Sequence, residues 1–302
     1  MKQLIFVHGI NNQDRTVEEI QALWSNTLLG SLGALADEWW DDVQVRTAYY
    51  ADVLFGAEQE WAVSSDTATP MSANSPDEDF APDHVAALYI EMQQALGVPD
   101  DEVSRRLNEG EAHAPAERMG KGVHKRWLKA IARTLEDVVP GVAPGIARSF
   151  LPQAAAYLNK PGLFEEINEL VEKQVFDPTD DLGQTVLVAH SLGTIVSYVL
   201  LRRKMGDSML PLFVTLGSPL GIRIVKDRIQ PPYVKPPIVR KWVNGSDRED
   251  FVALHPELTA HTFGPASITN IANLENGPDD PHDIAKYLAQ PSIALVIGQA
   301  LA

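Results

Sequence analysis

Short apolar runs that end in polar or glycine-containing loops recur along the chain, and each is typical of a buried strand. The predicted strands span residues 4–7, 43–50, 185–189, 212–216, 238–243 and 267–272. Apolar residues spaced by three and four predict helices after residue 16, over 83–96, 101–107, 121–139, 146–158 and 163–176, after residue 191, and after residue 282. Alternating strands and helices predict an α/β fold, with a mostly parallel central sheet flanked by helices.

The stretch over residues 51–181 breaks this alternation, because it has helical patterns and no convincing strand. A segment rich in Ser, Pro, Asp and Ala at 64–82 is typical of a loop. We therefore predict a core made of residues 1–50 and 182–302, with a large helical insertion over 51–181. We expect the insertion to cap the functional site as a lid. The alternative is that it extends the outer layer, with Trp127, Leu128 and Ile131 packed against the sheet.

Composition narrows the possible partners. The chain has 302 residues and a formal net charge of −16, from 41 acidic and 25 basic residues, which argues against nucleic acid or an anionic membrane surface. There is no cysteine, which excludes disulfides, thiolate metal sites and cysteine nucleophiles. The first residues lack the length and cleavage site of a signal peptide, and no apolar run is long enough to span a membrane. We expect a cytoplasmic protein with no integral membrane segment.

The most informative motif lies where the strand at 185–189 meets the following helix. It reads Ala189-His190-Ser191-Leu192-Gly193, which is the small-x-Ser-x-Gly pattern of a nucleophile elbow. Such a turn exposes the serine hydroxyl, and small residues two places on either side let strand and helix approach. The helix N-terminus also favours a developing anion. We interpret Ser191 as a nucleophile; the alternative is an ordinary strand-to-helix turn.

A second motif, His8-Gly9-Ile10, follows the first predicted strand. An esterase places half of its oxyanion hole in such a loop, because glycine lets the backbone bend so that the next N–H points into the site. We expect the N–H groups of Ile10 and Leu192 to form that hole. The alternative is a tight turn that simply requires glycine.

A serine nucleophile needs a histidine base that follows it in the chain order Ser, acid, His of esterases. Of the eight histidines, that order leaves His255, His261 and His282, and only His282 lies beyond the last predicted strand. We therefore predict His282 as the base. Ser218 also follows a predicted strand, but Pro219 removes the N–H that a nucleophile elbow would offer, so we interpret Ser218 as a loop residue.

The carboxylate that orients the histidine is expected in the loop after Val243. Asp247, Glu249 and Asp250 all qualify by position. Asp250 is favoured because the apolar pair that follows it, Phe251 and Val252, can hold the loop against the core. Asp247 is the alternative acid.

These motifs together resemble the α/β-hydrolase superfamily, in particular its lipase-like serine hydrolases. The resemblance covers roughly residues 1–55 and 184–302, through VHGI at 7–10, VAHSLG at 188–193, TLGSPLG at 215–221, WVNGSDREDFVA at 242–253 and PH at 281–282. Uncharacterised bacterial members share a W-x-N segment, then D-x-V-A and a late histidine, which implies Asp250 as the acid. The chain departs from the family pattern at Ala189, which replaces glycine, and at Phe251, which replaces a common proline. The sequence also starts directly at the His-Gly strand, so we expect the usual first two strands to be absent or replaced.

The function that follows is hydrolysis of a small-molecule carboxylic ester through an acyl-enzyme, with Ser191, His282 and Asp250 as a triad. No metal or cofactor is expected, because His-Glu-x-x-His and phosphate-binding glycine loops are absent. The same triad would serve a thioesterase or an acyltransferase. A non-catalytic ligand-binding protein on a hydrolase fold is the remaining alternative. The sequence leaves the acyl group and the oligomeric state open.

Overall fold

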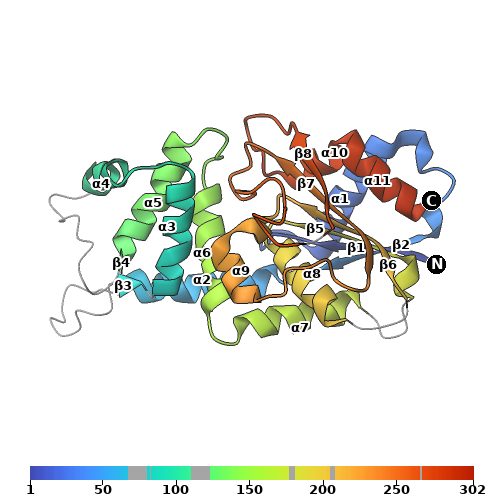
Figure 1. The fold of residues 1–302 in the computed structure, drawn as a ribbon, viewed down its shortest axis with the longest axis horizontal. Helices are drawn as coiled ribbons and strands as arrows, with labels where there is room; N and C mark the ends of the chain where they lie inside the picture. The colour runs from blue at the N-terminus through green and yellow to red at the C-terminus, as the bar shows by residue number, and fades with distance from the viewer. Residues whose placement is uncertain (67–79, 82, 110–122, 177–180, 205–207, 266) are drawn as a thin grey trace. The chain divides into compact units, whose positions relative to one another are not determined.

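A computed structural model of the protein describes residues 1–66, 80–81, 83–109, 123–176, 181–204, 208–265 and 267–302 (Figure 1). The chain forms two compact units. The sheet unit comprises Met1–Ala51 and Glu165–Ala302, and the helical unit comprises Asp52–Phe164. The second boundary was predicted at residue 181. It lies earlier, and ion pairs from Arg203 to Glu165 and from Lys204 to Glu172 join the helix that begins at Leu163 to the sheet unit.

The sheet unit contains six parallel strands in the order β2-β1-β5-β6-β7-β8. Their bounds are β1 Lys2–Val7, β2 Val43–Ala48, β5 Thr185–His190, β6 Leu210–Leu216, β7 Val239–Asp247 and β8 Thr269–Leu274. The central strands are buried on both faces, as β5 illustrates with all six residues buried. The predicted α/β class and the parallel sheet are confirmed. Because all strands run in one direction, their carboxyl ends share one edge of the sheet.

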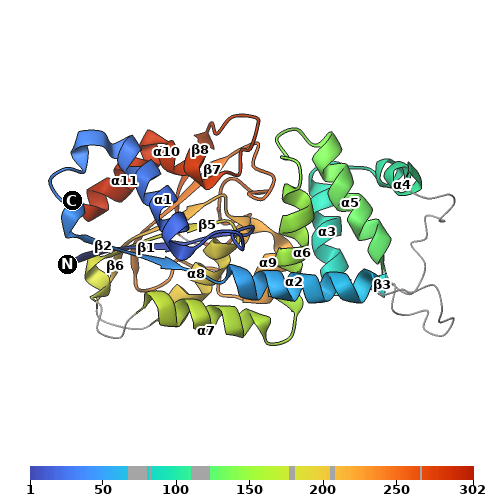
Figure 2. The ribbon, with the colours of Figure 1, turned by 180° about the vertical axis from the view of Figure 1, so that it is seen from behind.

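Helices cover both faces of this sheet. Their bounds are α1 Val17–Leu32, α7 Leu163–Val175, α8 Leu192–Arg203, α9 Arg223–Ile229, α10 Ile284–Ala289 and α11 Pro291–Leu301, and the short 3₁₀ turns are η1 Gly33–Leu35, η2 Trp40–Asp42, η3 Leu182–Gln184 and η4 Pro219–Gly221. Figures 1 and 2 show α1, α10 and α11 on one face, with α7 and α8 on the other. The predicted capping box of α1 is present, since Thr16 and Glu19 bond each other's backbone N–H groups.

The helical unit is built mostly from α2 Ala51–Asp66, α3 Asp83–Ala95, α4 Asp100–Glu109, α5 Lys125–Val138 and α6 Ile146–Asn159. Helix α5 buries Leu128 and Ile131 and contacts α3, α4 and α6. The prediction that this stretch contains no strand is wrong, because Phe80–Ala81 (β3) pairs with Val123–His124 (β4). Two-residue strands are too short for any periodicity to reveal them. In all the stretches that the structure describes, no helix is both long and apolar enough to cross a membrane.

The loop predicted over residues 64–82 is only partly described. Its first three residues belong to the last turn of α2, a helix that was not predicted, and β3 takes up 80–81. Residues 67–79 and 82 lie outside the described part of the chain. The 64–82 prediction is therefore wrong at its described ends and stays a prediction for the rest.

Strand β7 is longer than predicted, and this changes the site. The prediction ended the strand at Val243 and placed 244–250 in a loop, whereas β7 continues to Asp247. Polar residues can occupy a buried strand here because their hydrogen bonds are satisfied. Asn244 accepts a bond of 3.0 Å from Thr215 Oγ1 and donates one of 2.9 Å to the Pro256 carbonyl, which also accepts from Ser246 Oγ.

Candidate active site

Ser191 has the backbone conformation that the elbow motif demands. It lies between β5 and α8 with φ of 53° and ψ of −129°, a region that non-glycine residues rarely adopt. Strain of this kind persists only where the surroundings enforce it. The Ser191 N–H donates to the Leu216 carbonyl at 3.0 Å, and Thr194 Oγ1 donates to the Ser191 carbonyl at 2.7 Å. Both ends of the strained residue are therefore held.

Two glycines allow this turn to pack against the end of β1. A Cβ on Gly193 would lie 2.3 Å from the His8 carbonyl oxygen, and one on Gly9 would lie 2.5 Å from Ser191 Cβ. Neither close approach leaves room for a side chain. The predicted need for a small residue at 193 is confirmed, and Gly9 brings the β1 loop directly against the serine.

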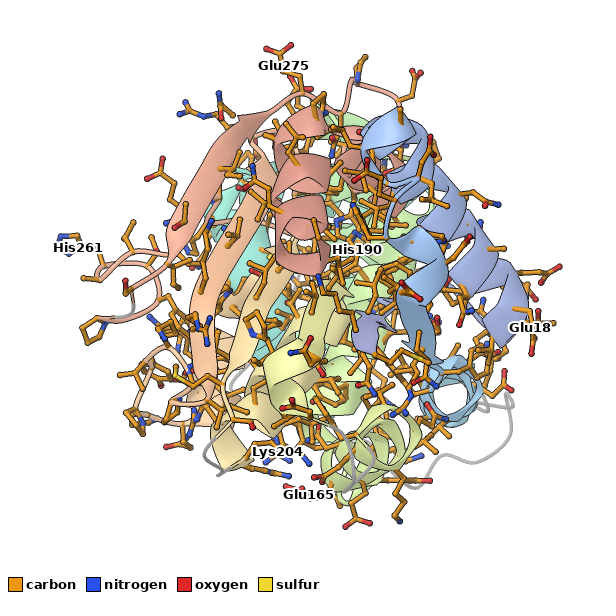
Figure 3. All side chains as sticks on the ribbon, turned by 90° about the vertical axis from the view of Figure 1, so that its right-hand side faces the viewer. Glu18, Glu165, His190, Lys204, His261 and Glu275 are labelled. Atoms are coloured by element: carbon orange, nitrogen blue, oxygen red, sulfur yellow. The ribbon has the colours of Figure 1, made fainter. Side chains whose placement is uncertain are left out.

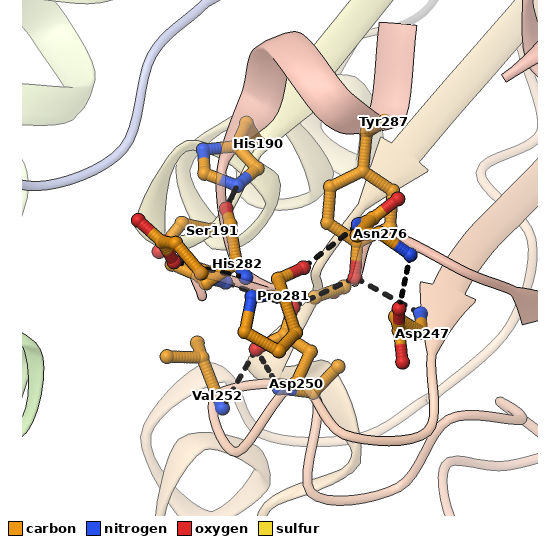
Figure 4. A network of polar contacts seen from close by, with 12 residues as sticks. His190, Ser191, Asp247, Asp250, Val252, Asn276, Pro281, His282 and Tyr287 are labelled. Carbon is orange, nitrogen blue, oxygen red and sulfur yellow. Dashed lines mark hydrogen bonds and ion pairs between the residues drawn. The ribbon is translucent and has the colours of Figure 1, made fainter. Parts of the chain in front are cut away.

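Asp250 and His282 meet at the same edge of the sheet (Figure 4). His282 Nδ1 lies 2.8 Å from Asp250 Oδ2, and both side chains are buried. Asp250 Oδ1 accepts the N–H groups of Val252 at 2.9 Å and Ala253 at 3.3 Å. Phe251 and Val252 are buried, which confirms that the apolar pair holds the loop. Because a carboxylate accepts hydrogen bonds, the Nδ1 of His282 carries the proton and its Nε2 is left as a base.

Two buried atoms at this edge have no hydrogen-bond partner among the described residues: Ser191 Oγ and His282 Nε2. They do not bond each other. They are brought to one place by His190, which directly precedes Ser191. Its ring packs against that of His282 with centroids 4.5 Å apart, and its Nε2 lies 2.8 Å from the His282 carbonyl oxygen. Unsatisfied buried polar groups are uncommon and often mark functional sites.

His190 is a neutral structural link between serine and histidine. Since a carbonyl only accepts, His190 Nε2 donates the hydrogen bond to His282. Burial lowers the pKa of His190 well below its ordinary value, and the charge of His282 lowers it further. Figure 3 shows His190 among packed side chains, in contrast to His261 at the surface.

The loop carrying Ile10 is held by its carbonyls. His8 Nδ1–H donates to the Gly9 carbonyl at 2.7 Å, and Asn12 Nδ2 donates to the Ile10 carbonyl at 2.7 Å. In a planar trans peptide the C=O and the next N–H point in opposite directions, so holding the Gly9 carbonyl also sets the direction of the Ile10 N–H. Leu192 is the first residue of α8, and its N–H has no acceptor within the helix.

His8 itself is a buried neutral histidine. Burial lowers its pKa to about 4, opposed by the hydrogen bond to the Gly9 carbonyl. Its Nε2 accepts the Tyr50 N–H at 3.2 Å, and the two rings stack 4.3 Å apart. Both ring nitrogens are therefore used in the neutral form.

The competing residues are placed elsewhere. Asp247 ends β7 and is 5% exposed, so its predicted place in the loop after Val243 is wrong. Its carboxylate accepts the N–H groups of Glu249 and Asn276. The Glu249 side chain and His261 are exposed, and His255 lies against Gly221. Of the three acids, Asp250 is the one hydrogen-bonded to His282.

Ser218 is tied into the structure. It has an ordinary extended backbone with φ of −88°, and its Oγ pairs with Thr194 Oγ1 at 2.8 Å and accepts the Leu220 N–H at 3.3 Å. This agrees with its interpretation as a loop residue.

Three further residues of the site were missed: His190, Asn12 and Tyr287. Tyr287 donates to Asp250 Oδ2 at 2.7 Å. His190 stands inside the elbow motif and could have been weighed there, whereas nothing in the sequence around Tyr287 or Asn12 signals a role. Within the described ranges, no group of three His, Asp or Glu side chains could hold a metal ion.

Comparison of the chain with models of protein families, with curated proteins and with solved structures gave no match.

Proposed function

We propose that the protein is a serine hydrolase of the α/β-hydrolase type that cleaves a carboxylic ester. One observation carries the proposal: a strained serine at a helix N-terminus adjoins a buried Asp–His pair, and neither the serine hydroxyl nor the outer histidine nitrogen has a hydrogen-bond partner among the described residues. Free polar atoms of this kind suit a serine and its general base, since each must meet a substrate.

In the proposed mechanism His282 Nε2 takes the proton of Ser191 Oγ as the oxygen attacks the ester carbonyl carbon. The N–H groups of Ile10 and Leu192 stabilise the resulting oxyanion, and losing one such donor typically costs about 3 kcal/mol in the transition state. His282 then gives its proton to the departing alkoxide, which leaves an acyl-enzyme. His282 next takes a proton from water as the water oxygen attacks the acyl carbon, and returns that proton to Ser191 Oγ as the carboxylic acid leaves. Asp250 holds the imidazole in the required tautomer throughout.

The experiment that tests this proposal is labelling with a fluorophosphonate, followed by peptide mapping. We expect one covalent adduct, on Ser191. A folded protein that takes up no label, or takes it up elsewhere, would contradict the proposal and favour a ligand-binding protein.

Two further comparisons separate the hydrolase from its alternatives. Rates on an activated ester and on the corresponding thioester distinguish an esterase from a thioesterase. Rates with and without an alcohol acceptor distinguish a hydrolase from an acyltransferase. We expect ester hydrolysis to dominate. The insertion over 51–181 is proposed to set the acyl preference, so shortening the predicted loop at 64–82 should change the profile of rate against chain length; an unchanged profile would contradict that role.

A further inference from the structure

One oxygen of Asp250 accepts two side-chain hydrogen bonds. Oδ2 receives His282 Nδ1–H at 2.8 Å and the hydroxyl of Tyr287 at 2.7 Å (Figure 4). The two donors therefore share the same negative charge. A hydrogen bond to a carboxylate stabilises its charged form and weakens its attraction for other protons.

The phenol of Tyr287 is a permanent donor in this position. The side chain is fully buried, and its oxygen accepts the Asp247 N–H at 3.0 Å, which polarises the hydroxyl. Burial, and after it the charge of Asp250, raises the pKa of Tyr287 well above its ordinary value. The hydroxyl therefore keeps its proton at neutral pH.

Asp247 contacts Tyr287 and also holds the loop that carries His282. Its carboxylate accepts the Asn276 N–H, and Asn276 Nδ2 donates to the Pro281 carbonyl at 2.7 Å, one residue before His282. The backbone of Asp247 thus bonds Tyr287, while its side chain reaches the His282 loop through Asn276. Asp247 therefore holds both Tyr287 and the His282 loop in position relative to Asp250.

We propose that Tyr287 is a positioning residue that limits how strongly Asp250 holds a proton on His282. This inference rests on the proposed function, in which His282 must be neutral to accept the proton of Ser191. Other groups face His282 as well. Asp280 accepts its backbone N–H at 3.2 Å, the His190 ring packs against its ring at a tilt, and Asp247 lies beyond Tyr287. With carboxylates at Asp250 and Asp280 and a neutral His190, the phenol offsets their preference for a charged imidazole, together with the Val252 and Ala253 N–H groups that Asp250 Oδ1 accepts.

The test replaces Tyr287 with phenylalanine. Without the hydroxyl, Asp250 Oδ2 interacts more strongly with a charged His282. As the pH is lowered, the variant should therefore lose activity at a higher pH than the unchanged protein does. We expect the acidic limb of the kcat/KM profile to move upward by about half a pH unit or more. The matched control is Tyr198→Phe, which removes a buried hydroxyl that donates to the carbonyls of Pro232 and Val234. We expect the control to leave the limb in place.

A readout independent of turnover separates this inference from the proposed function. The Nδ1–H proton resonance of His282, assigned by its loss in His282→Gln, should titrate with a midpoint that Tyr287→Phe raises by the same amount. If fluorophosphonate labelling fails but this midpoint shifts, the proposed function is wrong and the role of Tyr287 stands. If activity falls equally at all pH values and the midpoint is unmoved, Tyr287 is only structural.

Incorporation of 3-fluorotyrosine at position 287 guards against a phenylalanine variant that does not fold. It keeps the ring and the hydroxyl while making the hydroxyl a stronger donor, so the midpoint and the acidic limb should move to lower pH. A shift in the same direction as the phenylalanine variant, or none, would overturn the proposal.

Discussion

The centre of the site and its surround differ in how completely their polar atoms are hydrogen-bonded. The centre is Ser191, Asp250 and His282, and the surround includes Ser218 and Asp247. Ser191 Oγ has no partner among the described residues, whereas Ser218 Oγ has two. Both serines follow parallel strands at the same sheet edge. What separates them is the backbone, which is strained at Ser191 and ordinary at Ser218.

The aspartates show the same contrast. Asp247 uses its carboxylate on two backbone N–H groups, while Asp250 keeps one oxygen for side chains, including His282. Leaving a buried polar group unpaired costs about 1–3 kcal/mol, so a fold carries such groups only where something else requires them. In this site, buried polar groups whose hydrogen bonds are all made support the structure. Those without a partner among the described residues are available to meet a substrate. Changes at the centre should therefore cost activity, and changes in the surround should cost stability.

The largest effect is expected from the two serines. Ser191→Ala should abolish fluorophosphonate labelling and lower turnover of an activated ester by at least about 10⁴-fold, with no loss of stability. Ser218→Ala should keep the label and lower the free energy of unfolding by about 1 kcal/mol, because it removes satisfied hydrogen bonds. Labelling and urea denaturation of both variants measure this. Label that survives Ser191→Ala would break the contrast.

The two aspartates come next. Asp250→Asn should lower turnover by about 10⁴-fold, because the amide presents the wrong partner to His282 Nδ1. Asp247→Asn should lower turnover less than about tenfold but destabilise the fold by about 1–3 kcal/mol, since a buried carboxylate that accepts two N–H groups is replaced. Steady-state kinetics and denaturation give both values, with circular dichroism to show that each variant is folded. The reverse order of kinetic effects would make Asp247 the acid.

A glycine at the centre provides a smaller and more geometric test. A Cβ on Gly217 would lie 2.7 Å from Asp250 Oδ2 and 3.0 Å from His282 Nδ1, so Gly217→Ala should displace the pair and lower turnover by about 10²-fold. Gly97→Ala is the control, since Gly97 also has a positive φ, of 70°, but a Cβ there would meet no atom of the described residues within 4 Å apart from its chain neighbours. It should cost about 1 kcal/mol of stability and no turnover. Equal kinetic effects would show that backbone strain, not intrusion on the pair, matters.

The last prediction concerns stability alone. The pKa of His8 is about 4 in the folded protein, against a reference value of 6.5 for the unfolded chain. Below pH 6.5 the unfolded chain therefore binds a proton at His8 that the folded protein does not bind. Stability should therefore fall as pH drops from about 6.5 to about 4, by about 3 kcal/mol from His8. His190 acts in the same direction. Denaturation midpoints across this range should depend less on pH in His8→Asn, and should keep their slope in the exposed control His261→Asn.

Local features of the fold could be predicted because they depend on neighbouring residues. The capping box of α1 joins Thr16 and Glu19, three residues apart, and the elbow requires small residues within two places of Ser191. Buried central strands contain continuous apolar runs, so β1, β5 and β6 were found within a few residues of their ends. The end of β7 was missed because its polar residues satisfy their hydrogen bonds with Thr215 and Pro256, which are distant in the chain.

The sequence by itself determined the class of fold, the elbow at Ser191 and the shortlist of partners, because steric limits and apolar periodicity act over a few residues. Only the tertiary structure decided which carboxylate meets His282. Asp247 and Asp250 are three residues apart and chemically identical, and the choice depends on a loop 32 residues further along that packs its imidazole against Asp250. It also decided the place of Tyr287 and His190 around that pair. Pairings of this kind depend on packing and on the satisfaction of buried hydrogen bonds across the whole sheet edge, which no local pattern encodes.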